Sequence, residues 1–437
     1  MRDSSFEHEP GGIPNVVKLL IGLAAVGGIA LLALILFREE PPEPPPEPLN
    51  PDEYLKFPNP QNDWARANAV TRLSGDRKLL GMESCRPCHE KRVREFETTN
   101  HYLTSRQASE TTILGSFQAP RHIHATDEPE LSIHMRRRDD QFFQTAVLEG
   151  QPPQEFEFPI NLVIGSGRTA QTYLSWRRNW LYELPVSYSS QLDCWVKSPG
   201  YLNDEADFSR PVNSQCLRCH VTYVEELPER LNQFSHDKML LGISCERCHG
   251  SGVGHIRFHR EKQGEDTIVK PAELPRQQKI ELCSQCHGGD GEKFHQPIFS
   301  YHPGQPLEQF MKQEKSDGEK IGLHTAGEYG RLQRSPCFQQ SEMTCTTCHN
   351  PHKNELGRAK LFSQRCIQCH EVEQCSTAHR LGEVGRERCV DCHMPKVRVW
   401  DTDLAAGDRV AYPILHDHKI GIYEELSREV EEEIGEE

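Results

Sequence analysis

The sequence is short of apolar side chains. Hydrophobic residues make up 36% of its 437 residues, and aromatic residues make up 8%. This 36% includes one long hydrophobic run and the cysteines of a repeated motif. The rest of the chain is only about 30% apolar, whereas an ordinary globular chain has about 45–50% on a count that includes glycine. Side chains alone therefore give this chain a thin core, and something else has to fill it.

Basic residues are also outnumbered. The chain has 50 Lys and Arg against 65 Asp and Glu, for a formal net charge of -15. A surface that follows a phosphate backbone needs clustered Lys and Arg, so this balance excludes a generic nucleic-acid binder. A negative surface favours basic protein partners instead.

Cysteine and histidine, in contrast, are abundant, with 17 and 22 residues. The pattern C-x-x-C-H occurs seven times, where chance at this composition predicts roughly 0.03 matches. The motifs are Cys85/Cys88/His89, Cys216/Cys219/His220, Cys245/Cys248/His249, Cys283/Cys286/His287, Cys345/Cys348/His349, Cys366/Cys369/His370 and Cys389/Cys392/His393.

The motif matches the chemistry of covalent haem attachment. Two thiols three positions apart form thioethers with the two vinyl groups of one haem, and the following histidine becomes the proximal iron ligand. A zinc ribbon leaves the residue after the second cysteine free, a thioredoxin-like motif occurs once, and disulfides require no histidine. The sequence therefore predicts seven covalently bound c-type haems, whose macrocycles replace the missing apolar core. It singles out no catalytic residue.

The sixth ligands are predicted from position along the chain. A histidine that closely follows a motif, such as His352 three residues after His349, cannot pass around the porphyrin to the other face of the same iron. It can only reach a neighbouring haem. The preferred distal ligands are His101, His255, His302, His352, His379 and His418, with His124 or His324 as a seventh and His416 as a competitor of His418. For each of them the alternative is a surface or hydrogen-bonding histidine.

Three cysteines stay outside the motifs: Cys194, Cys337 and Cys375. Two of them could pair in an oxidising compartment, but the pairing is not readable from the sequence.

The sequence also predicts a membrane anchor. Leu19 to Phe37 runs for 19 residues without a charge, which is long enough to cross about 30 Å of hydrocarbon as a helix. A cleaved signal peptide would have a shorter core and a small-x-small cleavage site. An uncleaved anchor over residues 16–37 is therefore the preferred interpretation.

The expected fold is mainly α, with long irregular loops around a haem stack, one N-terminal transmembrane helix and a small β-containing insertion. Leu131, Ile133 and Met135 alternate with polar residues, and Phe142 to Leu148 follows a turn, as in a hairpin. The expected segments are an inner-side tail (1–15), the anchor (16–37), a Pro-rich linker (38–60), a haem 1 segment (61–110), the insertion (111–210), a haem 2–7 domain (211–420) and an acidic tail (421–437).

Longer phrases around the motifs indicate a family. CRPCHEKRVREFETTNH, LVIGSGRTAQTYLSW, CERCHGSGVGH, YHPGQPL, SPCFQQSEMTCTTCHNPH and CVDCHMPK resemble multihaem cytochromes of the cytochrome c554 and octahaem hydroxylamine-oxidoreductase-like group, over about residues 80–420. The resemblance implies electron relay through bis-histidine haems. It also implies that haem is attached on the far side of the membrane, which places a single-pass protein in the cell membrane with its haem domain in the periplasm or an equivalent space.

The leading prediction is thus a membrane-anchored heptahaem cytochrome that relays electrons in a periplasmic respiratory or redox chain. Its predicted partners are the membrane, through the N-terminal helix, and basic redox proteins. The main alternative is an oxidoreductase that acts on a small nitrogen or sulfur species at one five-coordinate haem, and quinol oxidation near the anchor is a third. Seven motifs instead of eight, and no C-x-x-C-K site, favour electron transfer over an enzyme.

Overall fold

The computed structural model describes residues 71–73, 77–150, 152–227, 232–289, 293–312, 327–399 and 404–435. The predicted tail, anchor and linker lie outside these residues. The longest helices described have 12 residues, or about 18 Å. None of the described helices is long and apolar enough to cross a bilayer. This finding contradicts the prediction of a transmembrane helix and of a single-pass membrane localisation, and we withdraw both.

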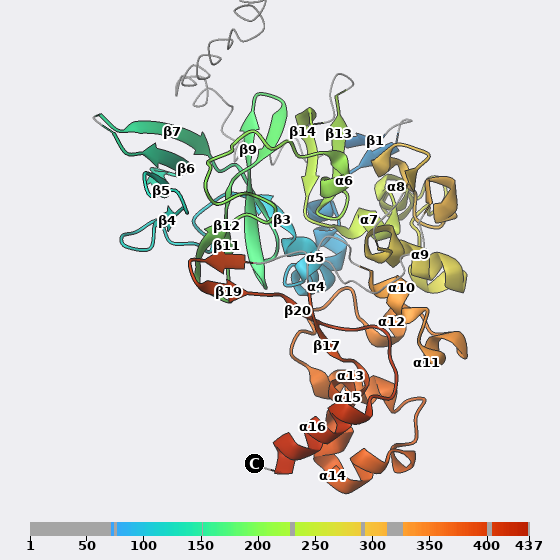
Figure 1. The fold of residues 1–437 in the computed structure, drawn as a ribbon. Coiled ribbons are helices and arrows are strands. Elements are labelled where there is room, and N and C mark those ends of the chain that lie inside the picture. Colours follow the sequence, from blue (N-terminus) through green and yellow to red (C-terminus); the bar gives the residue numbers. More distant parts are fainter. Residues whose placement is uncertain are drawn as a thin grey trace, which may run out of the picture. The chain divides into compact units, whose positions relative to one another are not determined.

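The prediction of a mainly α fold is wrong. The described residues form twenty strands and thirteen α-helices, and the paired strands are antiparallel (Figure 1). Some motifs lie in short helices, such as Cys245–His249 and Cys345–Cys348, whereas the first and fourth motifs belong to helices of 11 and 12 residues. The strands are Thr71–Leu73 (β1), Arg77–Leu79 (β2), Ser105–Gln107 (β3), Ile123–Ala125 (β4), Leu131–Arg138 (β5), Gln141–Leu148 (β6), Gln154–Pro159 (β7), Leu162–Ile164 (β8), Ala170–Arg177 (β9), Trp180–Glu183 (β10), Val186–Ser189 (β11), Cys194–Lys197 (β12), Val221–Glu226 (β13), Phe234–Leu241 (β14), Lys293–Phe294 (β15), Met311–Lys312 (β16), Lys396–Arg398 (β17), Leu404–Ala406 (β18), Arg409–Ala411 (β19) and Ile414–His416 (β20).

A six-stranded sheet is the centre of the β structure. Its strands follow the order β12-β11-β9-β8-β3, with β10 paired to β9. Successive side chains of a strand point to opposite faces, and here both faces are buried. Val163 and Tyr173 pack on one face against the insertion, while Leu162 and Leu174 pack on the other against the β13–β14 hairpin. This sheet therefore joins the insertion to the segment that carries the second and third motifs.

A four-stranded sheet, in the order β4-β5-β6-β7, forms the remainder of the insertion. The predicted hairpin is present as β5 and β6, with Arg138 opposite Gln141. Asp139, in the two-residue turn between them, has a φ of 51°, which matches the twist of such hairpins. Buried Ile133, Met135 and Phe142 carry the apolar face of the hairpin into the core.

The helices follow the motifs toward the C-terminus. In Figure 1 the strands β4–β12 lie to one side of α7–α9, and α13–α16 lie below α12. The acidic C-terminal segment is a helix, α16, which packs against α15 and α14. The α-helices are Arg86–Phe96 (α4), Asn100–Leu103 (α5), Ser214–Leu217 (α6), Cys245–His249 (α7), Val253–Glu261 (α8), Arg276–His287 (α9), Glu328–Leu332 (α10), Pro336–Gln339 (α11), Cys345–Cys348 (α12), Ala359–Cys366 (α13), Ser376–Glu387 (α14), Cys389–His393 (α15) and Glu424–Gly435 (α16).

Candidate haem-binding sites

Three of the motifs lie in short helices whose ends have identifiable local support. Asn213 caps α6 by accepting a hydrogen bond from the backbone N–H of Cys216 at 3.1 Å. A capping box of Thr344 and Thr347 starts α12. Helix α7 ends at Gly250, whose φ of 74° and whose closeness to the His302 ring, at 3.2 Å from the position of a Cβ, favour glycine. The cysteines and histidine of a motif are therefore held in a fixed mutual orientation.

Four of the seven motif histidines face a second histidine across a narrow gap. In three pairs the ring planes are nearly parallel, and in the fourth they are nearly perpendicular. The ring centres are 6.2 Å apart in His89–His255, with planes at 22°, 6.0 Å in His249–His352, at 26°, 6.0 Å in His349–His418, at 26°, and 6.2 Å in His101–His287, at 75°.

These separations fit a haem iron between the two rings. An imidazole nitrogen binds a first-row metal at about 2.0–2.1 Å and the ring centre lies roughly 1.1 Å behind it, so two imidazoles on opposite sides of one ion have ring centres about 6.3 Å apart. The second histidine of each pair is supplied by a segment other than the one that carries the motif. The haems would supply iron that cycles between the ferric and ferrous states.

Hydrogen bonds fix which nitrogen faces the gap. In each of the four pairs, one ring has its Nδ1 bonded to an oxygen, which leaves Nε2 as the ligand atom. The acceptors are Asp266 Oδ1 for His255 (2.9 Å), the Val269 carbonyl for His249 (2.9 Å), the His416 carbonyl for His418 (3.2 Å) and Glu328 Oε2 for His287 (3.1 Å).

Burial keeps several of these rings neutral. Burial lowers the pKa of His101, His349 and His352 to about 4, and the neighbouring His287, His418 and Arg92, respectively, contribute to the decrease. Neutral imidazole is the form that binds a metal, so these rings are ready to bind iron at pH 7.

The fourth pair contains an ion pair. Burial opposes the charge on His287, but the hydrogen bond and the charge of Glu328 raise the pKa of His287 to about 9. Burial also raises the pKa of Glu328, but the hydrogen bond from His287 and its charge outweigh this effect and hold that pKa at about 2.

Cysteines from different motifs lie against one another. Cys85 donates a hydrogen bond to Cys245, Cys219 to Cys286 and Cys283 to Cys345, and each bond raises the pKa of the donating thiol. These contacts bring together the attachment points of haems 1 and 3, 2 and 4, and 4 and 5. Weaker electrostatic interactions link Cys248 to Cys283, Cys348 to Cys369 and Cys366 to Cys389, from haems 3 and 4, 5 and 6, and 6 and 7.

The other motif histidines have different neighbours. His220 Nδ1 lies 2.8 Å from Thr104 Oγ1, and His393 Nδ1 lies 2.7 Å from the Gly421 carbonyl. Within the described ranges, the rings of His370 and His393 stack on no second imidazole. His370 is exposed.

Some of the predicted distal ligands lie opposite a motif histidine and others do not. The structure brings His101, His255, His352 and His418 to motif histidines. It places His302 beside Gly250, with Nδ1 at 2.8 Å from the Pro303 carbonyl, and His379 on the exposed side of α14. His124 is buried in β4, where Nε2 lies 3.0 Å from Asn203 Oδ1, and His416 has Nδ1 2.9 Å from the Met394 carbonyl. His324 lies outside the described residues.

The cysteines outside the motifs lie apart from one another. Cys194 is in β12 beside Arg409 at 3.2 Å, Cys337 is in α11, and Cys375 caps α14. Each of them is a free thiol.

Sequence reasoning missed three carboxylates. Glu246 lies between the cysteines of the third motif and accepts hydrogen bonds from the N–H groups of Leu80, Gly81 and Gly252 at 2.9–3.0 Å. Asp266 and Glu328 bond ligand histidines. A charged residue inside a C-x-x-C-H pattern was the one signal that could have drawn attention to Glu246.

Known proteins with sequences similar to this chain include cytochromes, and the family model that matches covers two of the motifs. The family model described as "Cytochrome c554 and c-prime" matches residues 196–250, which contain the second and third motifs. The dissimilatory sulfite reductase MccA of Wolinella succinogenes is 22% identical over 396 residues, which cover 73% of this chain and 51% of that protein. The multiheme cytochrome MtrA of Shewanella baltica is 24% identical over 185 residues, which cover 38% of this chain and 55% of that protein.

A solved structure, the undecaheme cytochrome from the S-layer of Carboxydothermus ferrireducens, aligns with 72% of this chain and 51% of its own, at 15% identity and a TM-score of 0.35. The chain spans about half the length of the relatives it matches. The repeated motif, the family model and the relative named as a multiheme cytochrome agree in the kind of cofactor. The chain is a multihaem c-type cytochrome.

Proposed function

We propose that the protein is a heptahaem electron relay, in which each C-x-x-C-H motif carries one haem and electrons pass between neighbouring irons. The observation that carries this proposal is the set of four histidine pairs with ring centres 6.0–6.2 Å apart. An iron with two histidine ligands has no open position for a substrate, so it can change its charge but cannot bind a reactant.

In this proposal His255, His352, His101 and His418 are the distal ligands of haems 1, 3, 4 and 5. Three of these haems receive the ligand from a segment next to another motif. His255 follows the third motif, His352 follows the fifth and His101 follows the first. Shared segments keep neighbouring haems at a fixed spacing, which a relay requires.

The contacts between motif cysteines support one continuous route. They connect the haems in the order 1, 3, 4, 5, 6 and 7, and haem 2 joins the route at haem 4. We therefore propose that haems 1 and 7 are the two ends and that haem 2 is a branch.

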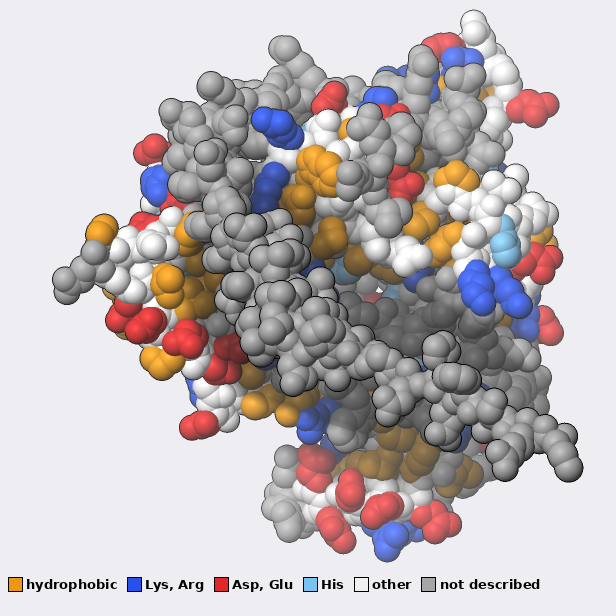
Figure 2. Space-filling view, turned by 45° about the horizontal axis from the view of Figure 1, so that its top comes forward, with side chains coloured by type: hydrophobic (Ala, Val, Ile, Leu, Met, Phe, Trp, Pro, Cys, Tyr) orange, Lys and Arg blue, Asp and Glu red, His pale blue; other side chains and the backbone are white. Residues whose placement is uncertain are grey.

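The acidic surface supports a basic redox partner. Exposed glutamates of α16 include Glu424, Glu425, Glu429, Glu432 and Glu433, and this helix packs on α15, which carries the seventh motif. Figure 2 shows acidic side chains gathered at the lowest part of the view, where the C-terminal helices lie. We propose that the partner docks near haem 7, and that its rate of electron exchange falls as salt is added.

A second candidate function is reduction of a small sulfur oxyanion. One relative is named a sulfite reductase, and two arginines line a small cavity between the second, third and fourth motifs. Buried Arg218 and Arg247 line it together with Tyr301. Among the described residues, Arg247 Nε and the Tyr301 hydroxyl have no hydrogen-bond partner. A haem without a distal ligand next to this cavity would support an enzyme.

Two measurements test the proposals. A pyridine haemochrome assay combined with the mass of the intact protein is expected to give seven haems per chain, and a lower number overturns the heptahaem proposal.

Low-temperature EPR of the oxidised protein, with carbon monoxide added to the reduced protein, separates the two functions. A relay gives only low-spin signals and no carbon monoxide adduct, whereas a high-spin haem that binds both carbon monoxide and sulfite supports the reductase.

A further inference from the structure

The oxygen that accepts the Nδ1 hydrogen bond differs from haem to haem. The acceptor for His249 and His418 is a backbone carbonyl, whereas His255 and His287 donate to the carboxylates of Asp266 and Glu328. The pairs His89–His255 and His249–His352 are otherwise closely matched, with ring centres 6.2 and 6.0 Å apart and planes at 22° and 26°. The two pairs therefore differ in the charge of the acceptor, a carboxylate on His255 in one and a carbonyl on His249 in the other.

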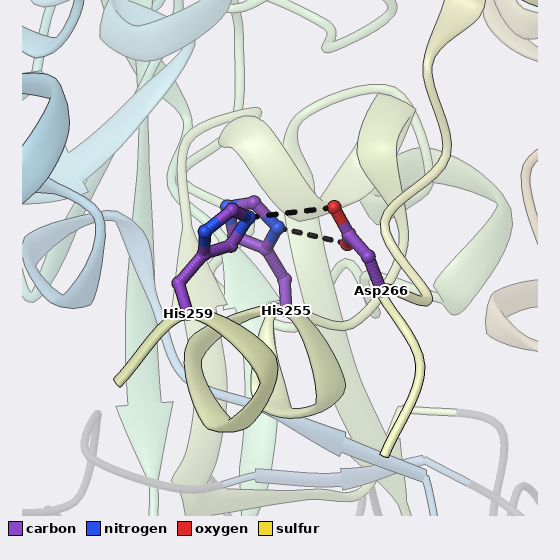
Figure 3. Close-up of side chains that lie close together, drawn as sticks. All are labelled: His255, His259 and Asp266. Atoms are coloured by element: carbon purple, nitrogen blue, oxygen red, sulfur yellow. Dashed lines mark hydrogen bonds and ion pairs between the residues drawn. The ribbon is translucent and has the colours of Figure 1, made fainter. Parts of the chain in front are cut away.

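Asp266 is held in place by several donors. Its Oδ1 accepts from His255 Nδ1 at 2.9 Å and from the Ile268 N–H at 3.1 Å, and its Oδ2 lies 3.5 Å from His259 Nε2. His255 and His259 are four residues apart on α8, so both rings leave the same face of the helix and point toward the carboxylate (Figure 3). The Asp266 side chain is 22% exposed and the His255 side chain 24%, which limits screening by water.

The same three side chains have the composition of a metal site, but a metal there would compete with haem 1. Their ligand atoms lie within 4.8 Å of one another. When Nε2 of His255 binds iron, its Nδ1 keeps a proton, and a protonated nitrogen has no lone pair for a second metal. The short His255–Asp266 distance is that of a hydrogen bond from this proton.

Glu328 repeats the arrangement at haem 4. It is the first residue of α10 and accepts from His287 Nδ1 at 3.1 Å, with its side chain 32% exposed. Asp266 and Glu328 come from different segments, so two separate parts of the chain supply a carboxylate to a paired histidine.

A carboxylate acceptor makes the histidine a stronger electron donor to iron. It pulls on the Nδ1 proton, raises the basicity of the ligand and places negative charge near the metal. Ferric iron carries one more positive charge than ferrous iron, so both effects favour the ferric state. Reduction adds one electron to the iron, the proton stays on Nδ1, and no bond forms or breaks.

We propose, on the basis of the bis-histidine relay above, that Asp266 and Glu328 are positioning residues that hold haems 1 and 4 at lower reduction potentials than haem 3. The relay then alternates in potential along the route 1, 3, 4. An electron on this part of the route is therefore most stable on haem 3, which lies between two haems that are harder to reduce.

The test is a potentiometric titration of the full-length holoprotein, followed by EPR. Asp266→Asn keeps the size and one acceptor oxygen of the side chain but removes its charge. We expect haem 1 to become easier to reduce by about tenfold in its ferrous-to-ferric ratio at a given potential, or about 59 mV for one electron. Glu328→Gln is expected to move haem 4 in the same direction. A haem 1 potential in D266N equal to that of the parent protein overturns the proposal.

Controls assign and interpret the change. His255→Met replaces the ligand itself and identifies which component of the titration is haem 1, while Asp140→Asn, at a side chain 93% exposed in the β5–β6 turn, is expected to change nothing. If D266N loses haem, Asp266→Glu keeps the charge and must restore both the haem content and the low potential. Restored haem content without the low potential also overturns the proposal. Fewer than seven haems in the parent protein, or a high-spin haem 1, would instead contradict the relay.

Discussion

At the residue scale, Glu246 shows how a motif position that binds no haem can hold the fold together. Its side chain is 4% exposed and accepts hydrogen bonds from the N–H groups of Leu80, Gly81 and Gly252. Burial raises the pKa of Glu246, and the three backbone donors oppose that effect. The residue thereby ties the start of the haem 1 segment to the third motif.

Glu246→Gln is expected to lower the free energy of unfolding by about 1–3 kcal/mol, because the amide N–H₂ replaces one acceptor oxygen and leaves backbone donors unsatisfied. Thermal unfolding of the holoprotein measures the change. Glu149→Gln, at an exposed position in the insertion, serves as the matched control. Equal stability of E246Q and the control would show that these hydrogen bonds do not matter.

Glu183 gives the protein a pH-dependent stability. Burial raises its pKa from 4.5 to about 7, although Arg210, at 3.4 Å, lowers it. Between these two values the folded state binds more protons than the unfolded state, so the free energy of unfolding falls as pH rises from about 4.5 to about 7 and then levels off. We expect this component to be on the order of 1–3 kcal/mol and to be absent in Glu183→Gln. Urea unfolding at several pH values measures it, and parallel pH profiles of E183Q and the parent would contradict the assignment.

At the element scale, the segment after β20 depends on a buried ion pair. Asp417, 5% exposed, accepts hydrogen bonds from the guanidinium of Arg331 in α10 and, at 2.8 Å, from the Lys419 N–H. Ser335 donates to the His418 carbonyl and accepts from the Ile420 N–H, both at 2.8 Å. These contacts hold His418 opposite His349.

Asp417→Asn is therefore expected to release His418 from haem 5. Loss of the charge from a buried pair costs about 3–5 kcal/mol, which is enough to loosen a loop. The expected result is a new high-spin EPR signal in the oxidised protein and carbon monoxide binding to the reduced protein. Asp408→Asn, in the exposed β18–β19 turn, is the control. A purely low-spin spectrum in D417N would show that His418 is held by other contacts.

The elements also show what the sequence could and could not predict. The hairpin at β5 and β6 was predictable because its signal is local: alternating residues around a two-residue turn. The order β12-β11-β9-β8-β3 was not, because it pairs strands through contacts that no local pattern encodes. The mainly α prediction was wrong because helices around the motifs do not determine the structure of the segments between them, which form strands.

The functional residues show the same contrast between local signals, which the sequence contains, and long-range contacts, which it does not reveal. The motifs were predictable because covalent chemistry fixes their spacing. His352 lies opposite His249 of another motif, as expected for a histidine so close to His349, and its role as a haem ligand stays a prediction. Asp266 and Glu328 lie 11 and 41 residues from the histidines they bond, among many other acidic residues, so only the fold distinguishes them.

At the scale of the whole molecule, the apolar core and the haems divide the stabilisation between them. The two largest clusters of buried apolar residues belong mainly to the sheets and include Tyr173, Leu181, Trp195 and Phe234. In the described residues from 327 onward, the clusters contain only a few buried side chains, such as Leu332, Phe338 and Leu404. Haem is expected to supply the missing core there.

Removal of haem is therefore expected to unfold the protein in part. In a variant with alanine at the fourteen motif cysteines, residues from about 105 to 241 should keep slow hydrogen exchange and resist limited proteolysis, while residues beyond about 327 should exchange rapidly. Mass spectrometry of the exchanged protein measures both. Equal protection of the two regions would contradict this division.

The histidine pairs also determine when, during synthesis of the chain, both ligands of a haem become available. In the proposed relay, haem 1 would be attached at Cys85 and Cys88, and its sixth ligand, His255, lies 166 residues beyond His89. At about 5–20 residues per second, the chain needs about 8–33 s to supply it. A haem attached to the first motif before His255 has been made would have one free face during that time. In the proposed relay, haem 1 therefore acquires both of its ligands only after the third motif has been made.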